Sequence, residues 1–148
     1  MSAPPDATRL YVETSALLRA LLEGDVALLA LLRAAALRAT SALTFVEAER
    51  ALVRAAGMGR LDAAQQREAR RWLREFRDSC DVIVLSAPIL ERAGKAFDVE
   101  PVRTLDALHL ASALFWEERL SVIVVASCDG QVRANARALG MDVVPATA

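Results

Sequence analysis

Short apolar segments typical of β-strands alternate along this chain with longer segments of helical periodicity. The strand-like segments cover residues 9–13, 39–43, 81–85, 121–126 and 141–144, although residues 39–43 could also be a simple connector. Strands that alternate with helices join through right-handed crossovers into a mostly parallel sheet with helices on both faces. The sequence therefore predicts an α/β fold in which a central sheet lies between two layers of helices.

Residues that favour helix ends predict the bounds of the helices. Thr14 and Asp25 are suitable N-caps for helices over residues 15–22 and 26–38. Thr44 and Glu47 match the capping box of a helix over residues 45–56. Further helices are expected over residues 61–78, 86–97, 105–118 and 130–139, with Thr104 and Asp129 as the caps of the last two.

The composition is apolar, with 55% hydrophobic residues and a mean hydropathy of +0.29. No apolar run approaches the roughly 18 to 20 residues that span a bilayer, because Arg33 interrupts the richest stretch at residues 27–37. The first ten residues lack the basic and apolar regions of a secretory signal. A length of 148 residues suffices for one hydrophobic core. We therefore expect a single domain over residues 1–148 that makes no membrane contact and stays in the cytoplasm.

Cysteine usage and net charge limit the class of function. Cys80 and Cys128 are too few for a disulfide framework and have no paired spacing for zinc, which fits a reducing compartment. The formal charge of −1 argues against a protein that coats nucleic acid by global attraction, but it leaves a local basic face open.

An arc of arginines lies in the segment 61–78. Its members are Arg67, Arg70, Arg71, Arg74 and Arg77, at helical spacing. The arc either grips RNA phosphates or forms a solvated helix face balanced by neighbouring acids, and we favour the solvated face because such faces are common.

Four carboxylates are expected at the carboxyl edge of the sheet, where ligands bind in open parallel sheets. Glu13 ends the first strand, and Asp129 lies just beyond the strand at 121–126. Glu47 and Asp106 fall in the first turns of helices that follow strands. Carboxylates that crowd together repel one another, and a divalent cation relieves that repulsion. Oxygen ligands without Cys or His suit Mg²⁺ or Mn²⁺ rather than zinc.

Each of these acids also has a simpler explanation. Glu47 could complete a capping box, Asp129 could be an N-cap, and Asp106 could be a first-turn acid favoured by the helix dipole. Glu13 is harder to explain in this way, because a carboxylate that ends an apolar strand is partly buried and needs a partner. The set is therefore stronger evidence for a metal site than any single member.

Four segments of the chain resemble the acidic motifs of PIN domains. Residues 11–17 (YVETSAL) resemble the opening strand and turn, where the family usually has Asp in place of Glu13. Residues 44–50 (TFVEAER), 103–114 (RTLDALHLASAL) and 125–144 resemble the second, third and fourth motifs. This resemblance implies a PIN-like α/β/α sandwich and a metal-dependent endoribonuclease of the VapC toxin type. It also implies RNA as the substrate, a cognate antitoxin protein and a homodimer.

The resemblance also implies roles for particular residues. Glu13 and Asp106 would be the principal ligands of Mg²⁺, and Glu47 and Asp129 would complete the acidic pocket directly or through water. Two hydroxyl groups, those of Thr14 and Ser127, could position water or phosphate. The extra methylene of glutamate at position 13 could reduce activity or shift the preference toward Mn²⁺, since Mg²⁺ demands near-ideal octahedral geometry.

Other interpretations remain open at the level of sequence. His109, three residues beyond Asp106, is interpreted as a packed or singly hydrogen-bonded histidine rather than a proton-transfer group. Cys128 is interpreted as a small neutral side chain rather than a nucleophile. Two alternative functions are a PIN-like RNA- or partner-binding protein weakened in cleavage by Glu13, and a receiver-like regulatory domain. The receiver-like reading fits less well, because the only lysine, Lys95, lies inside a predicted helix.

Overall fold

The structure, a computed structural model of the chain, describes residues 8–148. Most of the N-terminal segment that is expected to lack a secretory signal lies outside this range. Residues 8–148 form five strands, β1 (Arg9–Val12), β2 (Leu37–Ser41), β3 (Asp81–Ile83), β4 (Val124–Ala126) and β5 (Asp142–Val144). All neighbouring strands pair in parallel, in the order β3-β2-β1-β4-β5. The predicted α/β fold with a parallel sheet is therefore confirmed.

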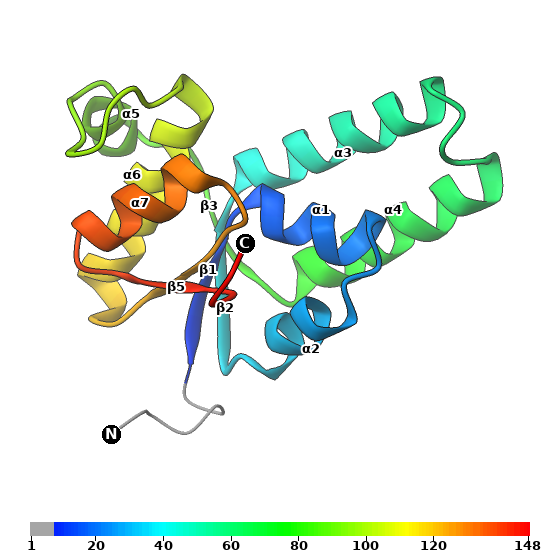
Figure 1. The fold of residues 1–148 in the computed structure, drawn as a ribbon, viewed down its shortest axis with the longest axis horizontal. Coiled ribbons are helices and arrows are strands. Elements are labelled where there is room, and N and C mark those ends of the chain that lie inside the picture. Colours follow the sequence, from blue (N-terminus) through cyan, green and yellow to red (C-terminus); the bar gives the residue numbers. More distant parts are fainter. Residues whose placement is uncertain (1–7) are drawn as a thin grey trace.

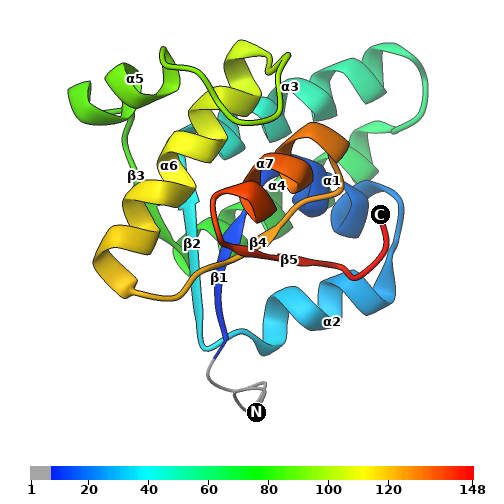
Figure 2. The same ribbon diagram turned by 60° about the vertical axis from the view of Figure 1, so that its left-hand side comes forward.

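Seven helices in residues 8–148 cover the two faces of this sheet. They are α1 (Thr14–Leu22), α2 (Val26–Ala34), α3 (Ala42–Gly57), α4 (Ala63–Asp78), α5 (Ala87–Ala93), α6 (Thr104–Leu120) and α7 (Gly130–Ala138). Figure 1 shows α1 to α4 on one side of the strands and α6 and α7 on the other, and Figure 2 shows α5 beside one end of α6. No helix in the described range is long and apolar enough to cross a bilayer.

Two hydrophobic clusters fill the space between the sheet and the two helical layers. Leu10 and Val12 of β1 belong to the cluster beneath α1 to α4. Tyr11, between them in the strand, belongs to the cluster beneath α6 and α7. Side chains of a strand alternate between the two faces of a sheet, so β1 is buried on both faces, as the central strand of a three-layer fold must be.

The chain visits one half of the sheet before the other. From the central β1 it passes to β2 and β3, and it then crosses to β4 and β5 on the opposite side of β1. The strand order therefore reverses between β1 and β4, and the crevice at their carboxyl ends is where ligands bind in open α/β sheets.

Helix α2 ends at Ala34, four residues before its predicted end at residue 38, and residues 37–41 form β2 rather than a connector. The backbone leaves the helix at Ala35, which is extended. Pairing of Leu37 and Arg38 with β1 outweighs the helical propensity of this leucine- and alanine-rich stretch. The Arg38 Nη1 atom donates to the carbonyl oxygens of Leu32, Arg33 and Ala35, each at 3.2 Å, and so closes the end of α2.

Helix α3 begins at Ala42, three residues before its predicted start, and its N-cap is Ser41 rather than Thr44. Thr44 is buried within the helix, where its hydroxyl is hydrogen-bonded to that of Thr40 at 2.9 Å. The predicted capping box of Thr44 and Glu47 is therefore wrong, and Glu47 lies in the second turn of α3 rather than the first. The simpler explanation for Glu47 is removed with it.

Other predicted ends shift by a few residues. Helix α1 begins at Thr14 with Glu13 as its N-cap, and α6 begins at Thr104 after Arg103, whose side chain makes no capping hydrogen bond. Strand β4 is shorter than the predicted 121–126, because Ser121 has a positive φ of 67° that ends α6 in a turn. Helix α5 stops at Ala93 rather than near residue 97. Asp25 and Asp129 cap α2 and α7 as predicted.

Candidate metal-dependent active site

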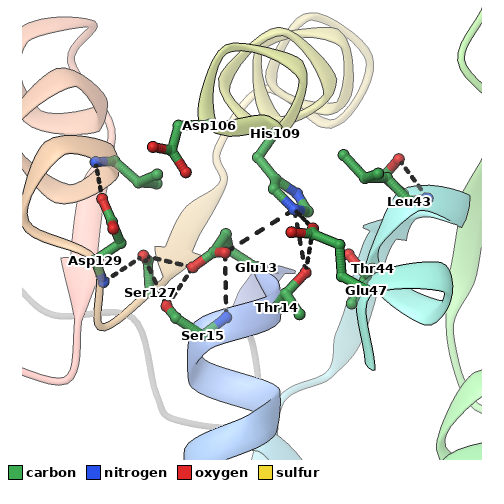
Figure 3. Close-up of polar contacts among 12 residues, drawn as sticks. Glu13, Thr14, Ser15, Leu43, Thr44, Glu47, Asp106, His109, Ser127 and Asp129 are labelled. Carbon is green, nitrogen blue, oxygen red and sulfur yellow. Dashed lines mark hydrogen bonds and ion pairs between the residues drawn. The ribbon is translucent and has the colours of Figure 1, made fainter. Parts of the chain in front are cut away.

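The predicted site residues gather at the crevice between the carboxyl ends of β1 and β4. Glu13 follows β1, and Ser127 and Asp129 follow β4. Figure 3 shows Ser127 and Asp129 on one side of Glu13. On its other side lie Thr14, Glu47 and His109. Asp106, on α6, lies on the same side as Asp129. The convergence arises because β1, β2 and β4 all lead into helices at this edge.

Glu13 is buried at 4% exposure, and three donors satisfy its carboxylate. Its Oε1 accepts from the Ser15 backbone N–H at 3.1 Å, and its Oε2 accepts from the Ser15 hydroxyl and from Ser127 Oγ at 2.8 Å. The two serine hydroxyls accept in turn from the backbone N–H groups of Cys128 at 2.8 Å and Asp129 at 3.1 Å. Glu13 thus ties the end of β1 to the loop between β4 and α7. Sequence analysis missed Ser15, whose position at the start of α1 suggested only a helix residue.

Removing the Ser127 hydroxyl is expected to destabilise this junction. Ser127→Ala withdraws a donor from a buried carboxylate and an acceptor from the Asp129 N–H, which should lower the free energy of unfolding by about 1–3 kcal/mol. Equilibrium unfolding in urea measures the change. Ser86→Ala is the matched control, because the buried Ser86 oxygen has no hydrogen-bond partner within residues 8–148 and its loss should cost nothing. Equal losses in the two variants would contradict this role for Ser127.

Glu47 and His109 form a second hydrogen-bonded group. His109 is 1% exposed, and its Nε2 lies 2.5 Å from Glu47 Oε1 and 3.9 Å from Glu13 Oε1. Because a carboxylate only accepts, His109 Nε2–H donates to Glu47, and Nδ1 is hydrogen-bonded to the Tyr11 hydroxyl at 2.8 Å. Thr14 Oγ1 also donates to Glu47 Oε1, at 2.8 Å.

The surroundings shift the acidities of this second group. Burial acts to raise the pKa of Glu47, but the hydrogen bonds from His109 and Thr14 and the attraction of His109 outweigh it and lower that pKa. Burial, and then repulsion from Glu13, raise the pKa of Tyr11 well above its ordinary value, so its hydroxyl stays protonated. His109 is buried as predicted, but it makes more than the single bond expected. Its spacing of three residues from Asp106 on α6 was the signal that could have placed it in the site.

Asp106 and Asp129 lie on the opposite side of the crevice and share one arginine. Asp106, in the first turn of α6, is 8% exposed. Burial, and then repulsion from Asp129, raise the pKa of Asp106 despite the nearby guanidinium. Arg103 Nε donates to Asp106 Oδ2 at 3.2 Å, and its Nη2 lies 3.6 Å from Asp129 Oδ2. The Asp129 Oδ1 atom accepts from the N–H groups of Gln131 and Val132 at 2.9 and 3.0 Å.

The donor set fits a hard divalent cation. The side chains that face the crevice offer carboxylate oxygens. Burial, and then the repulsion between Asp106 and Asp129, disfavour the ionised form of Asp106 and raise its pKa, and a bound cation would offset both effects. As the side chains stand, no three His, Cys, Asp or Glu residues of the described range are arranged to hold a metal ion. The reason is visible in the contacts, since Arg103 lies against Asp106 and Asp129, and His109 holds Glu47. The Arg103 side chain is 82% exposed, whereas that of Asp106 is 11% exposed, so the guanidinium approaches the buried carboxylate from solvent.

Comparison with known proteins identifies the family and the fold of the chain. The PIN domain family matches residues 10–138. A search of curated proteins gives no significant match. The crystal structure of PAE2754 from Pyrobaculum aerophilum is similar with a TM-score of 0.59 and 21% identity, over 94% of this chain and 87% of that one. The structure of FitAB bound to the IR36 DNA fragment is similar with a TM-score of 0.64 and 13% identity, over 90% of this chain and 92% of that one.

At these identities the two structures support the fold alone, whereas the family match covers most of the chain and includes all four carboxylates. PIN domains are in general metal-dependent nucleases. The chain belongs to the PIN-domain family.

Proposed function

We propose that this protein is a metal-dependent endoribonuclease that hydrolyses RNA phosphodiester bonds and acts as the toxin of a toxin–antitoxin pair, in the manner of VapC. The observation that carries the proposal is the pairing of Asp106 with Asp129 across the crevice from Glu13, at the reversal point of a PIN-fold sheet. RNA as the substrate and the toxin role come from the resemblance of the four motifs.

We propose that Asp106, Asp129 and Glu13 hold Mg²⁺ or Mn²⁺. Glu47, which lies beside His109, completes the acidic pocket. When bound, the cation supplies a Lewis acid for the scissile phosphate and a water of lowered pKa. Arg103 is exposed and reaches both aspartates, so it is suited to move from them onto a substrate phosphate. The hydroxyls of Thr14 and Ser127 donate to Glu47 and Glu13, and we propose that they act on the substrate only by positioning those carboxylates.

Cleavage of total cellular RNA tests the proposal. Purified protein without a partner is incubated with the RNA and Mg²⁺ or Mn²⁺, and the cut sites are mapped. Discrete cuts that EDTA abolishes are expected. Metal binding measured by calorimetry without any cleavage would instead favour the second candidate, a PIN-like protein that binds RNA or a partner, for which the glutamate at position 13 is the specific observation.

The substitution Glu13→Asp is expected to restore the family's usual first ligand. Aspartate is a strong N-cap, so α1 keeps its start, but the shorter side chain withdraws the carboxylate from Ser127 and leaves it freer for the cation. We expect tighter Mg²⁺ binding by about tenfold, or faster cleavage in Mg²⁺ relative to Mn²⁺. Calorimetric titration and cleavage rates in the two metals measure these effects, with Glu13→Gln as the control that removes the charge. If Glu13→Asp changes neither quantity, Glu13 is not a ligand.

We further propose a homodimer, a cognate antitoxin and a cytoplasmic location. Most leucines of α1 and α2 pack into the core, but Leu22 and Val26 are exposed, at 37% and 78%, and leave an apolar patch between the two helices. Such patches are suited to a protein partner. Light scattering of the purified chain checks the oligomeric state, and a monomer would contradict the dimer.

A further inference from the structure

We propose that a groove between α3 and α4 binds the phosphate backbone of single-stranded RNA and leads it to the carboxylates. This inference deepens the proposed function and rests on it. The groove has a volume of about 340 Å³. Its floor is apolar, formed by Phe45, Val46 and Leu73, and its rim carries Arg50, Arg74 and Arg77.

The three rim arginines are available for a ligand. All three are exposed, and none forms an ion pair with another residue of the range 8–148. Glu49, the one acid lining the groove, is held by Arg70 at 3.0 Å. The groove therefore presents a net positive charge, although the chain as a whole carries a charge of −1. This charge is a local feature and not a consequence of general basicity.

The groove adjoins the candidate active site through α3. Val46 precedes Glu47 in the helix, and Arg50 follows Glu47 by three residues. Residues at this spacing are neighbours on a helix surface, with Cβ atoms about 5–6 Å apart. Figure 1 shows α4 running back from the turn that follows α3. Near its end, Arg77 lies over the ring of Phe45, which is close to the start of α3. A strand whose phosphate lies in the crevice can thus continue directly along the groove.

The chemistry of the lining suits single-stranded RNA. Guanidinium groups bind phosphate through paired hydrogen bonds and stack on aromatic planes, as Arg77 already does over Phe45 at 4.9 Å from the ring centroid. Val46, 62% exposed, offers an apolar surface on which an unpaired base can lie. RNA is favoured over an acidic peptide because the groove opens beside the carboxylates that act on a phosphodiester.

This assignment differs from the predicted arc of five arginines on one helix. Arg71 pairs with Glu68 on the same helix at 2.6 Å, as expected of the solvated face that the sequence favours, whereas Arg70 reaches across to Glu49 of α3 at 3.0 Å. Arg74 and Arg77 line the groove together with Arg50 of α3, and Arg74 also borders the arginine-rich face of α4. The RNA-binding set is therefore divided between two helices, which helical spacing within a single segment cannot reveal.

Fluorescence anisotropy with a labelled single-stranded RNA of mixed sequence tests the groove. The full chain carries Asp106→Asn to prevent cleavage, and EDTA is present throughout so that binding is independent of the metal site. Replacing Arg50, Arg74 and Arg77 by alanine should weaken binding at least about tenfold at 0.1 M salt. The slope of log K against log salt should also fall by about 2, at roughly 0.7 per phosphate contact. Lysine at the same three positions should restore most of that slope.

A matched control removes three exposed arginines elsewhere, Arg33, Arg119 and Arg137 on α2, α6 and α7, and should change affinity less than twofold. Thermal melting confirms that each variant is folded. The groove proposal fails if the groove variant binds RNA as tightly as its parent. It also fails if poly-glutamate, at the same concentration of negative charge as the RNA, displaces the RNA, because that result would indicate a protein ligand. The proposed function survives both results if the unsubstituted chain still cleaves RNA with metal; if that chain neither binds nor cleaves RNA, both proposals fail.

Discussion

Asp106→Asn is expected to abolish RNA cleavage while making the metal-free protein more resistant to unfolding. Asparagine keeps the shape of the side chain but removes the charge that the cation needs, so cleavage should fall by about 100-fold or more. The same charge is unfavourable without a cation, because the site is buried and Asp129 lies nearby. Activity and stability should therefore move in opposite directions.

The pH dependence gives the sign of the stability change. The pKa of Asp106 is raised in the folded state, so protonation of this carboxyl favours folding. Its contribution is full below the ordinary pKa of about 3.8 and is lost as the pH rises through the raised value. At pH 7 without metal, Asp106→Asn should therefore melt at a higher temperature than the unsubstituted chain, and the difference should shrink as the pH approaches 4. Added Mg²⁺ should stabilise the unsubstituted chain alone.

Asp98→Asn provides the matched control, since Asp98 is exposed and makes no hydrogen bond or ion pair with another side chain of the range 8–148. It should leave both the cleavage rate and the melting temperature unchanged. Cleavage within a few-fold of normal in Asp106→Asn would exclude Asp106 as a metal ligand. A lower melting temperature than that of the unsubstituted chain at pH 7 would show that the bond to Arg103 outweighs the cost of burial.

The order of the elements and the direction of the sheet follow from local patterns. Buried parallel strands are short apolar runs such as VIVVA, and the helices between them form right-handed crossovers. The sequence alone therefore predicts that Glu13 and Asp129, which follow strands, lie at the carboxyl edge of the sheet. The positions of helix ends are less predictable. Ser41 and Thr44 are both acceptable caps, and the choice between them depends on Thr40, whose hydroxyl bonds to Val12 of the neighbouring strand at 2.7 Å.

The contacts within the site depend on tertiary structure and were not predictable. Tyr11 and His109 are separated by 98 residues, and Ser15 and Ser127 by 112. No local pattern encodes such pairs. A lone histidine on an apolar helix is compatible with simple packing, and only the fold reveals that the Tyr11 hydroxyl and the Glu47 carboxylate face its two nitrogens.

His109→Phe is expected to cause a larger loss of stability than Ser127→Ala. Phenylalanine fills a similar space but leaves the buried Tyr11 hydroxyl without its partner and Glu47 without a charge-assisted hydrogen bond. Each unsatisfied group costs about 1–3 kcal/mol, so the free energy of unfolding should fall by about 2–4 kcal/mol. Urea unfolding at pH 7 measures the loss.

A double-mutant cycle with Tyr11→Phe separates the lost hydrogen bond from a loss of packing. If the bond between Tyr11 and His109 is the cause, the second substitution should cost little once the first is made, and the coupling energy should be about 1–2 kcal/mol. Leu110→Ala, a buried apolar change on the same helix, should instead add to Tyr11→Phe without coupling. Additive losses for Tyr11 and His109 would show that His109 only fills space.

The pH dependence of the same variant reports on Glu47. The lowered pKa of Glu47 in the folded state stabilises the protein above the carboxyl's ordinary pKa of about 4.5, and this contribution is lost as the pH falls through the lowered value. In His109→Phe the burial of Glu47 is no longer offset by the histidine, so the stabilisation that Glu47 gives above its ordinary pKa should shrink, and the loss of stability between pH 7 and pH 3 should be smaller than in the unsubstituted chain. A smaller dependence of the unfolding free energy on pH would identify His109 as the group that keeps Glu47 ionised, because the loss of a residue that merely fills space would lower the stability by the same amount at every pH.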